Sequence, residues 1–404
     1  MRKIIKALCF AVIVFCSVLM GTVVYGFYAL PDNIHTMSGG DIDVGFYTCS
    51  LPDKGATEGY KSVATVGEYK LNISLFNKIP VKISNLTVSD RKYVVPSGDI
   101  IGLRLFTKGV MIVAVDSVDT HYGYVNPSKQ AKLQTGDVIT VLNGCEIESS
   151  SQVEKIISSC EGNSISVEYI RNNVTYETSI TPVYSASEAK FKTGLWIRDS
   201  AAGIGTMTFY EKNTGLFAGL GHAVCDIDTG EVLPLSNGDI VSAAISGCVK
   251  GKSGTAGELC GSFRNQSLGT LFLNDEFGVF GYLTDTDNAA EEIPVALKNE
   301  IKVGSAKIIS TVDETGKAYY DVEIEKINPD DKNGKNMIIK ITDIELIGKT
   351  GGIVQGMSGS PVIQDGKLVG AVTHVFLNDP TRGYAISAET MLNKVDNSNL
   401  KNVS

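Results

Sequence analysis

Short apolar runs separated by glycine and polar residues dominate the chain, and helix-like spacing is rare. The stretch KLNISLFNKIPVKISNLTV, residues 70–88, alternates well enough to predict two or three strands. From Ser187 to the C-terminus, the density of turn residues predicts an all-β barrel domain, with AETMLNKV near the end as a helical exception. We therefore expect a mainly β protein.

An apolar segment at the N-terminus departs from this pattern. Arg2, Lys3 and Lys6 precede about 23 uncharged residues, 8–30, enough to cross a bilayer of ~30 Å as a helix. Basic residues stay on the cytoplasmic side, so everything after Pro31 should lie across the membrane. A signal peptide is the alternative, but no A-x-A cleavage site follows. An uncleaved or late-cleaved anchor is favoured.

Residues 94–182 resemble a PDZ domain. The order of parts fits, and the pattern L-x-x-G-D-x-I-x-x-x-N-G runs from Leu133 to Gly144, where two turns flank one buried strand. Such domains pair an extended peptide with a strand beside a helix and hold its carboxylate in a glycine-containing loop. Here that loop would include Gly98, Gly102 and Leu103. It departs from the usual G-L-G-F, so binding of a free C-terminus stays open, and a packing module that binds no peptide is the alternative.

Composition narrows the function classes. A formal net charge of −9 and a pI near 5.1 argue against a nucleic-acid partner. The eight cysteines contain no CxxC, and there are only four histidines, so we expect neither a metal site nor a cofactor. Two cysteines lie in the apolar segment, and we expect the other six to be buried free thiols. The expected layout is an anchor (1–31), a small β-rich stalk (32–93), a PDZ domain (94–186) and a C-terminal barrel domain (187–404).

The stretch GMSGSP, residues 356–361, is the clearest chemical motif. A serine hydroxyl attacks only when a base takes its proton and N–H groups await the oxyanion. Ser358 is the candidate nucleophile, and the backbone N–H groups of Gly356 and Ser358 are the candidate oxyanion hole. The motif resembles the G-D-S-G-G-P turn of chymotrypsin-like peptidases, with Met357 and Ser360 in place of Asp and Gly.

A strand, an Asp-Gly turn and a second strand follow the motif, as in that fold. In this register Thr373, His374 and Val375 would pair with an extended substrate. The floor of the primary specificity pocket would be Gly352, which carries no carboxylate for Lys or Arg. We therefore expect no trypsin-like preference.

Four histidines are candidates for the base that takes the proton of Ser358. His35 is close to the membrane segment, His121 is in the PDZ-like region, and His374 is on the strand already assigned to the cleft. His222 remains, in GLFAGLGHAVCDIDTG, far before the serine, as in double-barrel peptidases with the base on the first barrel.

Spacing does not settle the third member of a triad. Asp226, Asp228 and Asp239 follow His222, whereas Asp343 precedes Ser358 by only 15 residues. In the usual double barrel the aspartate belongs to the first barrel.

Taken together, GLGHAV, ITD, GIVQGMSGSP and GAVTHVFLNDPTRGYAI strongly resemble the stage IV sporulation protein B family of serine peptidases. The resemblance covers almost the whole chain and implies His222, Asp343 and Ser358 as the triad, with Asp239 next for the aspartate. It also implies a location in the forespore membrane, facing the space between forespore and mother cell. There the enzyme would cleave a membrane-bound regulator, which releases intramembrane processing of a mother-cell sigma factor precursor. Family members also cleave themselves, and their PDZ domain serves self-recognition and target recognition.

Two other functions compete with this one. An HtrA-type quality-control protease has its peptidase before its PDZ domain, the opposite order. A membrane-tethered scaffold with an inactive barrel would have no reason to keep His222, Gly356 and Ser358 together.

Overall fold

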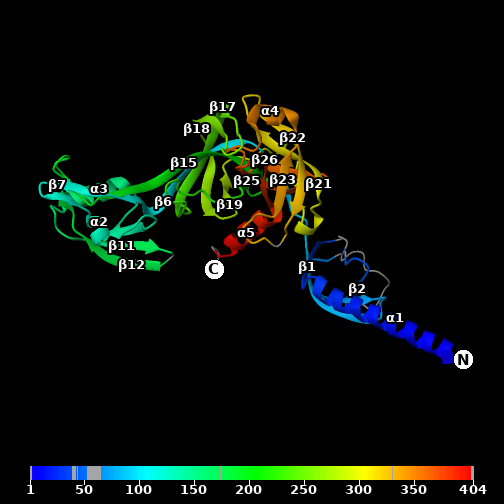
Figure 1. Ribbon diagram of the computed structural model, residues 1–404. Coiled ribbons are helices and arrows are strands. Elements are labelled where there is room, and N and C mark those ends of the chain that lie inside the picture. The colour runs from blue at the N-terminus through cyan, green and yellow to red at the C-terminus, as the bar shows by residue number, and fades with distance from the viewer. Residues whose placement is uncertain are drawn as a thin grey trace. The chain divides into compact units, whose positions relative to one another are not determined.

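The computed structural model describes residues 2–38, 42, 44–51, 65–172, 174–329 and 331–401, which form two compact units, 1–92 and 93–404. Figure 1 shows the elements of both units. The first unit begins with helix α1 (Arg2–Ala29). Its stretch Lys3–Ala29 is long and apolar enough to span a membrane, and an 18-residue window within it has a mean hydropathy of 2.6. The hydroxyls of Ser17 and Thr22 donate to the carbonyl oxygens of Ile13 and Val18, so both polar groups are satisfied within the helix.

A small sheet completes the first unit, in the order β1-β4-β3-β2. Its strands are β1 (Asn33–Met37), β2 (Thr48–Ser50), β3 (Gly67–Leu75) and β4 (Ile79–Ser89). The alternation in residues 70–88 thus produces two paired strands, with Leu71, Ile73 and Leu86 in the core. The end of α1 contacts this module, because the Tyr47 hydroxyl donates 2.8 Å to the carbonyl oxygen of Thr22.

The second unit contains two barrels and a PDZ-like module. The first barrel and its edge use β5 (Tyr93–Pro96), β6 (Ile100–Val115), β15 (Leu195–Tyr210), β16 (Leu216–Gly219), β17 (Leu235–Val249), β18 (Glu258–Asp275), β19 (Gly278–Leu283) and β20 (Ile293–Pro294). The barrel closes in the order β6-β17-β18-β19-β16-β15, since β15 pairs back onto β6. Phe217, Leu103 and Val279 lie in its core.

The second barrel is closed in the order β21-β22-β23-β26-β25-β24. Its elements are η1 (Lys298–Glu300), β21 (Gly304–Thr311), β22 (Lys317–Ile327), β23 (Met337–Ile341), α4 (Ile344–Thr350), β24 (Pro361–Gln364), β25 (Lys367–Phe376), β26 (Asp379–Ser387) and α5 (Ala388–Lys401). The mainly β architecture with barrels and a PDZ domain was therefore predicted correctly.

The PDZ-like module, residues 108–199, lies in the chain between two strands of the first barrel. It contains β7 (Val118–Thr120), β8 (Gly123–Val125), α2 (Pro127–Gln130), β9 (Val138–Leu142), β10 (Cys145–Glu146), α3 (Ser150–Ser159), β11 (Ile165–Arg171), β12 (Val174–Ile180), β13 (Val183–Tyr184) and β14 (Phe191–Lys192). The last residues of β6 pair with β9, and the first residues of β15 pair with β6. Both long strands therefore belong to the barrel at one end and to the PDZ-like sheet at the other (Figure 1).

This topology corrects the expected peptide-binding loop. Gly102 and Leu103 lie in the barrel half of β6, between β15 and β17, and Leu103 is buried. Gly98 donates its N–H to the carbonyl oxygen of Met207, and a Cβ at Gly98 would clash with Ile309 of the second barrel. These three residues are barrel backbone, because β6 continues unbroken where a PDZ loop would turn.

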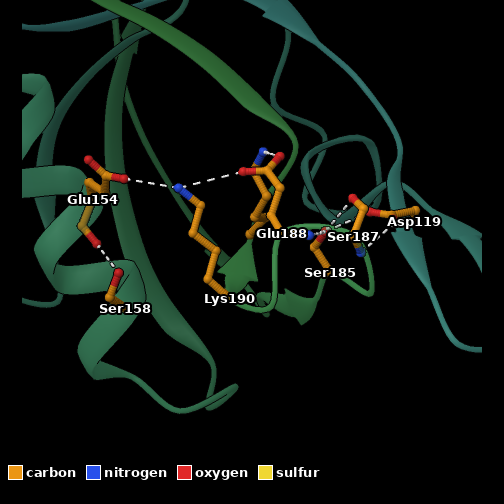
Figure 2. A network of polar contacts seen from close by, with 8 residues as sticks. Asp119, Glu154, Ser158, Ser185, Ser187, Glu188 and Lys190 are labelled. Carbon is orange, nitrogen blue, oxygen red and sulfur yellow. Dashed lines mark hydrogen bonds and ion pairs between the residues drawn. The ribbon is translucent and has the colours of Figure 1, made fainter.

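The segment after β12 is attached to the PDZ-like module itself (Figure 2). Lys190 forms ion pairs with Glu154 of α3, at 3.2 Å, and with Glu188, at 3.6 Å. Asp119, in β7, accepts from the hydroxyl of Ser185 and the N–H of Ser187, and these bonds lower the pKa of its carboxyl. These contacts hold residues 181–194 against the PDZ-like module, and β15 begins directly after them.

The cysteines are free thiols, but the expectation of burial holds only in part. Cys49 is buried, whereas Cys145, Cys225 and Cys260 are exposed. Cys145 and Cys260 lie in β10 and β18, where alternation turns every second side chain outward, and Cys225 lies in the loop between β16 and β17.

Candidate active site

Ser358 lies in the turn before β24 and is half-buried between the two barrels. Its hydroxyl donates a 2.7 Å hydrogen bond to the carbonyl oxygen of Thr373 on β25. Gly359 has a φ of +98°, and a Cβ there would lie 2.0 Å from the carbonyl oxygen of Thr206. Only glycine fits this position, because the turn presses against the first barrel.

Two backbone N–H groups of the same turn are candidates for the oxyanion hole, those of Gly356 and Ser358. Gly356 has a φ of +96°, a conformation that favours glycine. Within the described residues, neither the Gly356 N–H nor the Ser358 N–H donates to a protein acceptor. Unpaired donors beside a nucleophile are what stabilisation of an oxyanion requires.

Thr206 of β15 braces this turn from the first barrel. Its hydroxyl donates 2.7 Å to the carbonyl oxygen of Gly356, and its N–H donates 3.1 Å to that of Ser358. We did not identify Thr206 from the sequence. The only signal was its place in a strand of small and apolar residues, GIGTMTF, which is typical of any barrel.

His222 follows a left-handed turn at the end of β16. Leu220 and Gly221 have φ angles of +64° and +70°. A Cβ on Gly221 would lie 2.8 Å from Cγ2 of Thr373, so this glycine allows the chain to approach β25. The ring of His222 then lies beside that of His374, with centroids 5.0 Å apart and planes inclined by 42°.

Ser358 and His222 therefore contact two neighbouring residues of β25. Ser358 contacts Thr373, and His222 contacts His374. No hydrogen bond joins Ser358 to His222 within the described chain, so proton transfer requires the Ser358 hydroxyl to turn away from Thr373. Val375, the third residue expected beside a substrate, is partly buried next to them.

Both imidazoles favour the neutral form. Burial lowers the pKa of His222, partly offset by its contact with a backbone oxygen. The pKa of His374 is lowered to about 4, first by desolvation and then by His222 and Lys335. A neutral imidazole is the form that accepts a proton from serine.

Asp343 is not joined to His222. It is the N-cap of α4, where its side chain accepts 2.9 Å from the Leu346 N–H, and its other oxygen accepts 3.3 Å from the Asp321 N–H. Nδ1 of His222 instead lies 2.8 Å from the carbonyl oxygen of Ala223. The expected carboxylate–imidazole pair is absent among the described residues, because an aspartate directly before a helix is a preferred cap.

The other candidate, Asp239, is also used elsewhere. It forms an ion pair with Arg104 between β17 and β6. At the expected pocket floor, Gly352 is buried against the carbonyl oxygen of Pro380. The Thr350 hydroxyl donates a hydrogen bond to the carbonyl oxygen of Gly352.

Beside α3, the edge strand of the PDZ-like sheet is the first part of β15, residues 195–199. Within the described residues it pairs with β6 on one side and has no strand partner on the other. Gly194, with a φ of +75°, precedes it, and the Ser150 N–H of α3 donates 2.8 Å to Asp199. The edge that a peptide could extend thus comes after the PDZ-like core in the chain.

Comparison with family profiles gives two matches. Residues 189–392 match the family described as SpoIVB peptidase S55, and residues 98–181 match the PDZ domain. Comparison with curated proteins gave no significant match.

Solved structures similar to the chain include PDZ domains and peptidases. The PDZ domain of the SdrC-like protein Lmo2051 from Listeria monocytogenes is 21% identical, with a TM-score of 0.19, over 22% of this chain and 87% of that chain. The active form of the Rv3671c protease from M. tuberculosis is 14% identical, with a TM-score of 0.28, over 48% and 74%. The HtrA-type protease AlgW with a decapeptide is 11% identical, with a TM-score of 0.30, over 74% and 63%.

Proposed function

The chain belongs to the SpoIVB peptidase S55 family and is a PDZ-containing serine peptidase, and we propose that it is an extracytoplasmic signalling endopeptidase of sporulation. Its proposed substrate is a membrane-bound regulator of a sigma-factor processing complex, with its own chain as a second substrate. The proposed location is the forespore membrane, facing the space between forespore and mother cell, with α1 as the anchor. The sporulation role rests on the family resemblance.

In the proposed reaction, Ser358 attacks the scissile carbonyl carbon while His222 takes the hydroxyl proton. The Gly356 and Ser358 N–H groups hold the oxyanion. Collapse of the intermediate expels the amine, which receives the proton from His222. Water then attacks the acyl-enzyme while His222 takes a proton from it, and the Ser358 oxygen leaves and receives that proton. The contacts of Ser358 with Thr373 and of His222 with His374, two neighbours on β25, are the observation that carries this proposal.

Asp343 stays the proposed third member on the motif alone, since the structure uses it as a helix cap. Asp343→Asn tests this, because asparagine caps a helix as well as aspartate but carries no charge, and only the 3.3 Å bond from the Asp321 N–H is lost beside it. A fall in hydrolysis without a change in melting temperature supports the role. Unchanged hydrolysis removes Asp343 from the triad.

The PDZ domain is proposed to bind a peptide, from a substrate or from a second copy, by strand addition at residues 195–199. Addition at this edge needs only main-chain groups, so it does not depend on the loop at Gly98.

A fluorophosphonate probe tests the enzyme assignment. Full-length wild type should be labelled, and Ser358→Ala and His222→Ala should not. Incubating wild type beside Ser358→Ala and sequencing the fragments then reports self-cleavage and specificity. Equal labelling of Ser358→Ala would contradict the nucleophile, and no labelling of folded wild type would favour an inactive scaffold.

A further inference from the structure

The loop that carries His222 is attached to the PDZ-like sheet by one arginine. Arg198 lies on β15 where that strand pairs with Met111 of β6. Its guanidinium forms ion pairs with Asp226 and, at 2.7 Å, with Asp228. Both carboxylates follow His222 closely in the chain, at four and six residues.

Asp226 organises the loop around this contact. Its side chain is fully buried, and one oxygen accepts from the N–H groups of Asp228, at 3.0 Å, and Thr229, at 2.9 Å. The other oxygen accepts from Arg198. Burial raises the pKa of Asp226, but these N–H groups and Arg198 outweigh it and lower the pKa overall. The carboxylate is thus ionised at neutral pH and needs a cation, because an unpaired buried charge is costly.

Other contacts attach the same loop at both ends. On the barrel side, the Asn274 side chain bonds to the N–H and the carbonyl oxygen of Val224. On the PDZ side, Leu233 is fully buried in a cluster with Met111 and Val138. Arg198 adds a directional, charged contact to this apolar one, and such paired hydrogen bonds fix geometry more tightly than packing does.

We propose that Arg198 is a positioning residue of the peptidase, which holds the His222 loop from the PDZ-sheet end of β15. This rests on the proposed function, since it assumes that His222 is the base. Arg198 contacts neither Ser358 nor His222 by a hydrogen bond in the described structure. Its loss should therefore loosen the base without removing a reacting group, and misplacement by about 1 Å can cost up to about a hundredfold in rate.

The test is the rate of fluorophosphonate labelling of the full-length chain, separated into kinact and KI. Arg198→Gln should lower kinact about tenfold or more while KI stays within about twofold, because loop order affects the reacting step. Arg198→Lys should restore part of the rate by returning the charge. Arg104→Gln is the matched control. Arg104 of β6 also forms an ion pair with an aspartate, Asp239 of β17, but has no hydrogen bond or ion pair with the His222 loop among the described residues, so labelling should stay near wild type.

The outcomes separate the two proposals. Labelling of Ser358→Ala would overturn the proposed function. If Ser358→Ala is unlabelled but Arg198→Gln has the wild-type kinact, or if Arg104→Gln falls as far, only the role of Arg198 fails. If Arg198→Gln does not fold, Arg198→Lys decides by the same ratio of kinact values to wild type: a lowered kinact supports the role, because lysine keeps the charge but not the paired contact with Asp226 and Asp228, and a wild-type kinact overturns it.

Discussion

The hydroxyl of Thr206 donates a 2.7 Å hydrogen bond to the carbonyl oxygen of Gly356, and so links the first barrel to the turn that holds Ser358, the proposed nucleophile. The bond fixes the peptide that precedes Met357 and Ser358. The proposed oxyanion hole therefore depends on both barrels.

Thr206→Val should destabilise the chain and slow labelling of Ser358. The change keeps the shape but leaves a buried carbonyl without its donor, at a cost of about 1–3 kcal/mol. Thermal unfolding and labelling rates measure both effects.

Thr208→Val is the matched control on the same strand. Thr208 is equally buried, but its hydroxyl has no hydrogen-bond partner among the described residues. Its replacement should be neutral or stabilising, because an unsatisfied polar group is removed. A larger loss at residue 208 than at 206 would contradict this account of the turn.

Gly359→Ala should abolish labelling. Its φ is +98°, and the added Cβ would lie 2.0 Å from the Thr206 carbonyl oxygen and 2.6 Å from the Leu220 nitrogen. The turn must move away from both. Gly366→Ala provides the comparison, since Gly366 has a φ of +74° but open space around it, and should cost only about 1–2 kcal/mol of backbone strain. Normal labelling of Gly359→Ala would show that the turn is less constrained than described.

Asp343→Ala should lower the free energy of unfolding by about 1 kcal/mol, because the Leu346 N–H at the start of α4 loses its acceptor. Asp343→Asn should lose less, because its amide oxygen keeps the cap and only the longer 3.3 Å bond from the Asp321 N–H is lost. Thermal unfolding of the two variants side by side is the measurement, and equal losses would rule out capping as the source.

Stability should fall as the solution is acidified from about pH 6.5 toward pH 4. An unfolded chain protonates histidine near pH 6.5, whereas folded His374, with its pKa lowered to about 4, stays neutral until lower pH. Between these values the unfolded state binds more protons, so acid favours unfolding. His222 shifts in the same direction.

Melting temperatures of wild type and His374→Gln at pH 7 and pH 5 test this. The variant should lose less than wild type on acidification. His121→Gln, on an exposed turn, should behave as wild type does. An equal acid effect in His374→Gln would assign the pH dependence to other groups.

Local patterns made part of this predictable. The glycines around Ser358 indicate a constrained turn, and those before His222 indicate a turn with positive φ angles. Both signals are local, because such backbone conformations favour glycine at the position itself. The strands at 70–88 and the capped helix α3 follow equally from local sequence.

Long-range pairing was not predictable in the same way. An alternating strand such as residues 100–115 has the same pattern whichever sheets it joins, so Gly98, Gly102 and Leu103 were assigned to the wrong one. The bond of Thr206 to Gly356 spans 150 residues and leaves no mark in either segment. The sequence allowed two roles for Asp343, helix cap and catalytic partner, and only the hydrogen bonds of the folded chain identify the cap.

The sharing of β6 and β15 has a practical consequence for dissection of the protein. A fragment starting at residue 187 would lack β6 and leave two barrel strands, β15 and β17, with bare edges. A fragment ending at residue 186 would lack β15 and β17, the strands that pair with β6 in the barrel, and would leave β6 with an unpaired edge. The PDZ-like module and the first barrel share the strands β6 and β15, so a single cut in the chain cannot yield either of them intact.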